Sequence, residues 1–192
     1  GTTRSRPSTR TTAIITYHRR LGNRHMRIHV TGASGSGTTT LGRALADHLG
    51  YGYFDSDDYF WLPTEPPYRA KRDPEERNRM LLADFGATPD CVESGSILSW
   101  SPEITALLDA VVFLWIPSEI RLARLREREL EKLGRIDPEF LEWAAGYDRP
   151  GNRETRSRLL HEEWLDALAC PVLKLEGDLS TDERLGRVLD WL

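Results

Sequence analysis

Nine consecutive residues, GASGSGTTT from Gly32 to Thr40, have the composition of a loop that binds phosphate. Glycines permit tight backbone turns whose N–H groups point inward and form a cradle for phosphate oxygens. A helix is expected to begin directly after the glycines, and its N-terminus would add about half a positive charge at the same place. We expect a nucleotide to bind through its phosphates to the following residues: Gly32, Ala33, Ser34, Gly35, Ser36, Gly37, Thr38, Thr39 and Thr40.

The spacing within this segment fits the P-loop pattern at every position but one. Gly32 and Gly37 are separated by four residues, and Thr39 stands where the Ser or Thr hydroxyl of a P-loop contacts Mg²⁺. The pattern has Lys after the second glycine, whereas this chain has Thr38. Because that Lys places a positive charge on the β- and γ-phosphates, its absence predicts weaker binding or slower transfer, unless an Arg or Lys from elsewhere supplies the charge.

Acidic residues follow the second and third expected strands. Asp55 and Asp57 come directly after the apolar pair Tyr53-Phe54, and Glu93 is expected to end the third strand. Since open parallel sheets bind ligands at the carboxyl ends of their strands, these carboxylates could hold Mg²⁺ through water or accept a hydroxyl proton. A solvated acidic turn is the alternative for the first pair. The cost of burying an unpaired carboxylate favours a functional role for Glu93.

Residues 121–160 contain ten basic and eight acidic side chains. Arginines are suited to the negative charge that spreads over the oxygens of a phosphoryl group during transfer. An exposed helix with many ion pairs would account for most of these charges without any role in chemistry. The arginines that we expect to act on the phosphates are Arg124, Arg128, Arg153 and Arg156.

These motifs resemble those of the small P-loop kinases, such as the adenylate, cytidylate and shikimate kinases. The resemblance extends over residues 26–192; it is firm for residues 32–58 and Glu93, and looser for residues 110–160. It implies an α/β fold with a five-stranded parallel sheet of order 2-3-1-4-5, helices on both faces and a helical lid at about residues 118–160. ATP and Mg²⁺ are the cofactors that it implies.

The same resemblance implies roles for single residues. Asp55 would serve the metal together with Thr39, and Asp57 would contact the acceptor and act in catalysis. Glu93 would replace an Asp that orients Mg²⁺-bound water. The loop at residues 177–178 would hold the nucleotide base through backbone contacts, and the four arginines named above would belong to a lid that closes over the phosphates.

The elements that must position these residues alternate along the chain. Short apolar runs predict strands at residues 28–30, 53–54, 91–93, 110–116 and 172–175. Amphipathic patterns predict helices at residues 39–49, 74–85, 120–133, 138–145, 154–168 and 185–192. Strands that alternate with helices indicate a parallel sheet with helices on both faces, and the continuous apolar run 110–116 is typical of a strand covered on both sides.

Composition predicts one folded domain over residues 26–192. The chain has 192 residues, of which 39% are hydrophobic and 29% charged, which is neither a disordered nor a fibrous composition. No apolar run approaches the ~18 residues that a membrane span requires, so no membrane partner is expected. Cys91 and Cys170 alone can form neither a disulfide framework nor a Cys-rich zinc site. We expect a cytoplasmic protein.

Residues 1–25 form a basic N-terminal extension with six arginines and no acidic residue. We expect it to be disordered, although a targeting segment and a nucleic-acid-binding arm are alternatives. The other residues comprise 20 basic and 30 acidic side chains. That balance disfavours nucleic acid as a partner, because neutralisation of phosphates dominates such binding.

The sequence thus predicts a phosphotransferase that passes the γ-phosphoryl group of Mg·ATP to a small acceptor. A nucleoside monophosphate and a hydroxylated metabolite are both compatible with residues 59–71, where the acceptor would bind, and GTP could replace ATP. The alternative is an ATP-binding or sensing module with weak or no catalysis, because Thr38 replaces the P-loop Lys.

Overall fold

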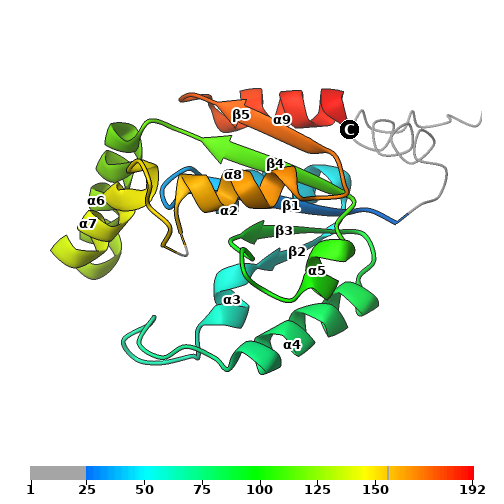
Figure 1. Cartoon of the computed structure of the whole chain (residues 1–192), viewed down its shortest axis with the longest axis horizontal. Helices are drawn as coiled ribbons and strands as arrows, with labels where there is room; N and C mark the ends of the chain where they lie inside the picture. Colours follow the sequence, from blue (N-terminus) through cyan, green and yellow to red (C-terminus); the bar gives the residue numbers. More distant parts are fainter. Residues whose placement is uncertain (1–24, 155) are drawn as a thin grey trace, which may run out of the picture.

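A computed structural model describes residues 25–154 and 156–192, so most of the predicted extension 1–25 lies outside the described residues (Figure 1). Five parallel strands form one sheet in the order β2-β3-β1-β4-β5, which confirms the predicted fold class and strand order. The strands are β1 (Arg27–Gly32), β2 (Gly52–Asp55), β3 (Cys91–Gly95), β4 (Ala110–Trp115) and β5 (Val172–Glu176).

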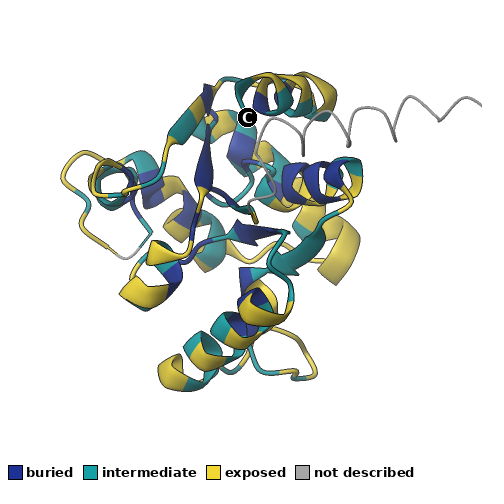
Figure 2. Ribbon diagram, turned by 90° about the vertical axis from the view of Figure 1, so that its right-hand side faces the viewer, coloured by how far each residue is buried: buried dark blue, intermediate teal, exposed yellow. Residues whose placement is uncertain are grey.

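Helices cover both faces of the sheet. Buried side chains of two helices pack on one face, and those of three others, together with Tyr59, pack on the opposite face. Figure 2 shows the buried residues along the sheet and the inward sides of the helices. The first pair is α2 (Thr38–Leu49) and α9 (Thr181–Trp191). The second set is α4 (Pro74–Ala87), α5 (Pro102–Ala106) and α8 (Arg158–Asp166). Among the described residues, no helix combines the length and the apolar character needed to cross a membrane.

The remaining helices lie at the carboxyl ends of the strands. Helix α3 (Ser56–Phe60) follows β2 directly. Figure 1 shows α6 (Ser118–Leu133) and α7 (Pro138–Ala145) beyond the end of β4, and the 3₁₀ turn η1 (Gly146–Asp148) continues α7. Residues 118–148 therefore fall within the segment, about 118–160, for which the family resemblance implies a lid.

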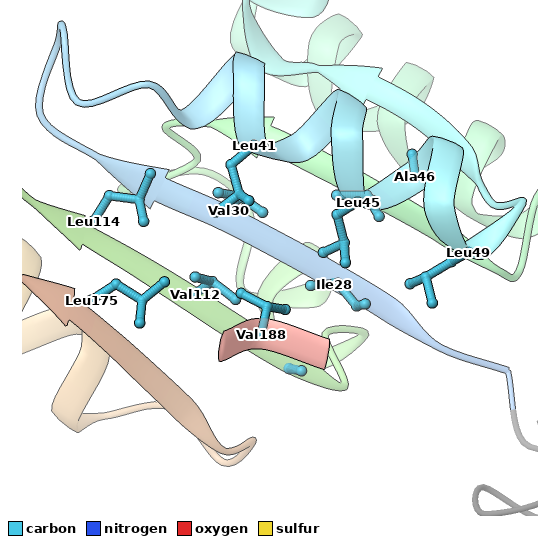
Figure 3. Packing of buried hydrophobic residues seen from close by; sticks show 12 residues of the cluster. Ile28, Val30, Leu41, Leu45, Ala46, Leu49, Val112, Leu114, Leu175 and Val188 are labelled. Carbon is cyan, nitrogen blue, oxygen red and sulfur yellow. The ribbon is translucent and has the colours of Figure 1, made fainter. Parts of the chain in front are cut away.

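The periodicity of α2 explains how it fixes the phosphate-binding segment. Leu41, Leu45 and Leu49 recur every four residues, so they share one face of the helix, and they point toward Ile28 and Val30 of β1 in Figure 3. All five side chains are at most 3% exposed. Burial of such side chains stabilises each by ~1.5–3 kcal/mol, which fastens the start of α2 to the end of β1.

The starts of two helices differ by four residues from those predicted, because capping residues set them. Helix α8 begins at Arg158 and not at residue 154, since the Ser157 hydroxyl accepts a hydrogen bond from the N–H of Leu160. Helix α9 begins four residues before the predicted Leu185, because Ser180 and Glu183 form a capping box.

Two short helices, α3 and α5, were not predicted. Asp55 caps α3 by accepting from the N–H of Asp57, and Ser101 caps α5 by accepting from the N–H of Glu103. The acidic run after β2 is therefore the first turn of a helix, not an open turn.

Candidate active site

The phosphate-binding segment is a loop between β1 and α2 in which glycines are required by the backbone. Gly35 and Gly37 have φ angles of 82° and 91°, which side chains disfavour. A Cβ on Gly32 would lie 2.5 Å from the carbonyl oxygen of Leu114, and one on Gly35 would lie 2.8 Å from that of Arg121. Gly37 is the N-cap of α2 and has no side chain to cap the first-turn N–H groups. Those donors are therefore available to an anion.

Thr39 and Asp55 meet at the mouth of this loop. The Thr39 hydroxyl donates to Asp55 Oδ2 at 3.2 Å, and the Tyr53 hydroxyl donates to the same oxygen at 3.2 Å. Tyr53 also lies 2.6 Å from the Ser94 hydroxyl. Asp55 Oδ1 accepts from the N–H of Asp57 at 3.1 Å. Hydroxyl and carboxylate oxygens are ligands suited to Mg²⁺, which usually takes the rest from water and phosphate.

The site offers few protein ligands for a metal ion, which is consistent with a Mg²⁺ that takes most of its ligands from water and phosphate. Within residues 25–154 and 156–192, no three His, Cys, Asp or Glu side chains gather as metal ligands would. A Mg²⁺ ion held by Thr39 and Asp55 would therefore need oxygens from a bound polyphosphate.

The position predicted for Glu93 is wrong. β3 continues to Gly95, so Glu93 lies in the middle of the strand and is fully buried. Its carboxylate pairs with Nδ1 of His29, the residue beside it in the β1–β3 ladder. Ser94 belongs to the opposite face, where it would contact a Cβ on Gly42 of α2. Glu93 is thus directed away from Thr39 and Asp55, and Ser94 supplies the polar group on their side.

Asp57 lies in the first turn of α3, where the charges of two of the predicted arginines influence it. Its pKa is raised because surrounding protein displaces water and because Asp55 is near, while Arg156 and Arg128 act in the opposite direction. The side chain is nevertheless open to solvent. An exposed carboxylate is therefore within electrostatic range of two guanidinium groups from separate parts of the chain.

Arg128 and Arg156 each contact one of two stacked aromatic rings of helix α7. Arg128 lies 5.9 Å above the ring of Phe140, and Arg156 lies 5.8 Å from that of Trp143. The two rings stack with centroids 5.8 Å apart and planes at 27°. A small pocket joins this stack to the phosphate loop, since Ser34 and Tyr147 line it together with Trp143 and Arg156.

The other two predicted arginines lie apart from this cluster. Arg124 pairs with Asp178 after β5, and Arg153 pairs with Glu163 of α8 at 2.8 Å. Arg153 and Glu163 are both exposed, so this is a surface ion pair. Of the four predicted arginines, Arg128 and Arg156 are the two whose charges influence Asp57. The predicted roles of Arg124 and Arg153 stay predictions.

Two arginines that the sequence analysis did not select contact the phosphate loop. Arg121 of α6 is fully buried and donates to the carbonyls of Ser34 and Ile116 and to Asp148. Arg184 of α9 is 5% exposed and donates to the carbonyl of Ser36 at 2.7 Å. No local pattern marks Arg184, because its role depends on how the last helix packs against the first.

Comparisons with known proteins support this fold. The structure of shikimate kinase from Acinetobacter baumannii superposes with a TM-score of 0.56 at 20% identity, over 90% of this chain and 95% of that protein. TT1252 from Thermus thermophilus superposes with a TM-score of 0.51 at 18% identity, over 88% of this chain and 96% of that one. The fold is that of the P-loop kinases.

A sequence comparison places the chain in a family. It is 44% identical over 175 residues to the uncharacterized protein YqaC of Bacillus subtilis, covering 86% of this chain and 96% of that protein. The chain therefore belongs to the YqaC family. No family model matches the chain.

Proposed function

We propose that the protein is an ATP-dependent phosphotransferase whose acceptor is a nucleoside monophosphate or a small hydroxylated metabolite. The observation that carries this proposal is an exposed carboxylate, Asp57, that the charges of Arg128 and Arg156 influence, together with a small pocket that Arg156 and Ser34 of the phosphate loop line. A loop alone would suit any nucleotide-binding protein. An accessible carboxylate with arginines in its vicinity is, in addition, suited to a phosphoryl acceptor.

The loop fits the phosphates of ATP for physical reasons. Gly32 and Gly35 cannot carry side chains without collisions, and no side chain caps the N–H groups at the start of α2. Thr39 and Asp55 would hold Mg²⁺, which would neutralise charge on the transferring phosphoryl group. The whole segment from Gly32 to Thr40 is thus proposed to bind the phosphates, and Thr39 and Asp55 are proposed to bind the metal.

Asp57 is suited to take a proton from a hydroxylated acceptor. In that reaction the acceptor oxygen bonds to the γ-phosphorus, the bond from phosphorus to the bridging oxygen of ADP breaks, and the hydroxyl proton passes to the Asp57 carboxylate. Arg128 and Arg156 would stabilise the negative charge on the phosphoryl oxygens. A nucleoside monophosphate acceptor would instead bring an anionic oxygen, for which the same arginines provide the counter-charge.

A second function, ATP binding without efficient turnover, is favoured by Thr38. This residue occupies the position of the P-loop Lys and carries no charge. Replacement by Lys separates the two functions, since a large gain in turnover for Thr38→Lys would indicate a weakened catalyst, whereas a loss would show that the natural site already works with Thr.

The experiment that tests the proposal is ADP release from Mg·ATP by the full chain. Nucleoside monophosphates, sugars and hydroxylated acids would be supplied one at a time, with Thr39→Val as the control that keeps the shape of Thr but removes its hydroxyl. Acceptor-dependent release that Thr39→Val abolishes is the expected result. A flat response across acceptors, with ATP still raising the melting temperature, would instead favour the binding module.

A further inference from the structure

The carbonyl groups of the phosphate loop are held from outside by two buried arginines. Arg121 donates to the carbonyl of Ser34 at 3.1 Å, and Arg184 donates to that of Ser36 at 2.7 Å. When these carbonyls point outward, the N–H groups between them are free to point into the loop. The two contacts therefore stabilise the loop in the conformation that binds an anion.

The two arginines differ in how their charge is balanced. Arg121 forms an ion pair with Asp148 at 2.6 Å, which neutralises it locally. Arg184 donates to the neutral carbonyls of Ser36 and Gly177, and within the described parts of the chain it forms no ion pair. Asp178, whose charge acts to raise the pKa of Arg184, is paired with Arg124. Arg184 is thus a buried positive charge without an ion-pair partner among the described residues.

This charge stands at the turn where the P-loop pattern would place its Lys. Nη1 of Arg184 lies 3.1 Å from the position that a Cβ on Gly37 would take, and Thr38 is the next residue. Burial and the neighbouring Arg124 lower the pKa of Arg184, but a guanidinium stays protonated at neutral pH. A buried charge is weakly screened by solvent, so it attracts an anion at the loop strongly.

We infer that Arg184 is a positioning residue for the polyphosphate of the nucleotide, and that it replaces the charge of the missing P-loop Lys from the last helix of the fold. This inference rests on the proposed function for its ligand, a nucleoside triphosphate. Arg184 acts through the Ser36 carbonyl and through its charge, and direct contact with the phosphates is not required.

The competing explanation is that Arg184 only fastens α9 to the loop. The two explanations differ in the effect of charge, because a fastening role is the same for every nucleotide. Arg184→Gln keeps an N–H donor and removes the charge, and Arg184→Lys keeps the charge. Arg187 is exposed on the same helix, so Arg187→Gln is a control with the same change in net charge.

The test measures the equilibrium affinities of ATP, ADP and AMP by calorimetry, with thermal unfolding of each variant in parallel. We expect Arg184→Gln to weaken ATP binding on the order of tenfold or more, ADP less and AMP least. Arg184→Lys should retain most of the affinity and Arg187→Gln all of it. Addition of Thr38→Lys to Arg184→Gln should restore ATP affinity, because it returns a charge to the same turn.

Two results would overturn the inference. One is an equal loss for ATP, ADP and AMP in Arg184→Gln, which is the mark of a purely structural role. The other is failure of Thr38→Lys to restore ATP binding in a folded Arg184→Gln variant. If the wild-type protein binds ATP but transfers no phosphoryl group, the inference stands and the proposed transferase activity fails. If the wild-type protein binds no nucleotide, both are wrong.

Discussion

The phosphate loop and helix α7 hold their neighbouring arginines in different ways. On the side of the phosphate loop, Arg121 and Arg184 are buried and donate to backbone carbonyls. On the side of the lid, Arg128 and Arg156 rest on aromatic rings. Nε of Arg156 has no hydrogen-bond partner within the described structure, and Trp143 beneath it is 40% exposed.

This difference shows that one site can combine arginines of fixed orientation with arginines whose hydrogen-bond donors stay available. Hydrogen bonds to carbonyls fix both the position and the direction of a guanidinium. Stacking on a ring fixes the plane of the guanidinium but leaves its N–H donors free. We therefore propose that the loop holds the polyphosphate of the donor in one position, whereas Arg128 and Arg156 follow the phosphoryl group as it moves from donor to acceptor.

The largest effect is expected at Asp57, the carboxylate that the charges of Arg128 and Arg156 influence. Asp57→Asn should lower the turnover rate by about 10²–10⁴-fold, because the amide cannot accept the acceptor proton, and should leave ATP affinity nearly unchanged. Asp58→Asn is the matched control on the same turn. Steady-state kinetics and calorimetry would measure both effects, and comparable turnover in the two variants would contradict the role of Asp57.

A methyl group tests whether the loop side is rigid. Gly35→Ala would place its Cβ 2.8 Å from the carbonyl of Arg121, so the loop must shift, at a cost of about 1–3 kcal/mol in the free energy of unfolding. ATP affinity should fall by at least about tenfold, as the N–H groups lose their alignment. Gly134→Ala is the control: its φ is also positive at 66°, but the space around it is open. Equal ATP affinity in both variants would mean that the loop is not rigid.

The aromatic stack tests the lid side. Trp143→Leu removes the ring between Phe140 and Arg156, and each exposed cation–aromatic contact is worth ~0.5–1 kcal/mol. We expect kcat/KM for the acceptor to fall roughly threefold to tenfold, with little change in ATP affinity. Trp143→Phe keeps a ring and should behave nearly as wild type. A loss of the same size in Trp143→Phe would show that stacking is not what positions Arg156.

The pH dependence of stability tests the environment of the buried His161 of α8. Burial, Arg156 and His29 lower the pKa of His161 to about 3, whereas an unfolded His titrates near ~6.5. The unfolded state therefore binds a proton first as pH falls, and the folded state should lose stability from about pH 6.5 toward pH 3, by up to ~1.4 kcal/mol per pH unit.

Two variants isolate this titration in chemical denaturation at several pH values. His161→Gln and Tyr147→Phe both remove the hydrogen bond between the two side chains, but only His161→Gln removes the titrating group. A flatter pH dependence is expected for His161→Gln alone. An equally steep curve for both variants would assign the acid sensitivity to other groups.

The smallest effect is expected at Arg153. It is exposed and paired with Glu163, and surface ion pairs contribute only about 0–1 kcal/mol. Arg153→Gln should change kcat/KM less than about twofold. Arg156→Gln should reduce kcat/KM by at least about tenfold, which is roughly the contribution of one charge-assisted hydrogen bond. A large loss of kcat/KM in Arg153→Gln would show that Arg153 takes part in the reaction.

The fold was predictable because its determinants are local. Apolar runs gave the five strands, the pattern of Leu41, Leu45 and Leu49 gave α2, and the glycine spacing gave the loop. Strand order came from the family resemblance, because periodicity does not contain it. The boundaries of α8 and α9 were missed where a serine cap, Ser157 or Ser180, outweighed periodicity.

The site was predictable in part, for a different reason. Arg128 and Arg156 were selected by residue type and Asp57 by the family resemblance, and the charges of both arginines influence Asp57 in the structure. Glu93 was misplaced because its partner His29 lies on a strand distant in sequence but adjacent in the sheet. Arg184 was missed because its contact with Ser36 spans almost the whole chain. Interactions between distant segments leave no periodic signal.

The most direct test of the central claim follows the phosphoryl group itself. ATP labelled at the γ-phosphate would be incubated with Mg²⁺, a small-molecule extract of cells and either the wild-type protein or Asp57→Asn, and the labelled products separated. We predict that the wild-type protein transfers label to a new small molecule and that Asp57→Asn, although it still binds ATP, does not. Label found only in ATP and inorganic phosphate, with no difference between the two proteins, would contradict phosphoryl transfer at this site.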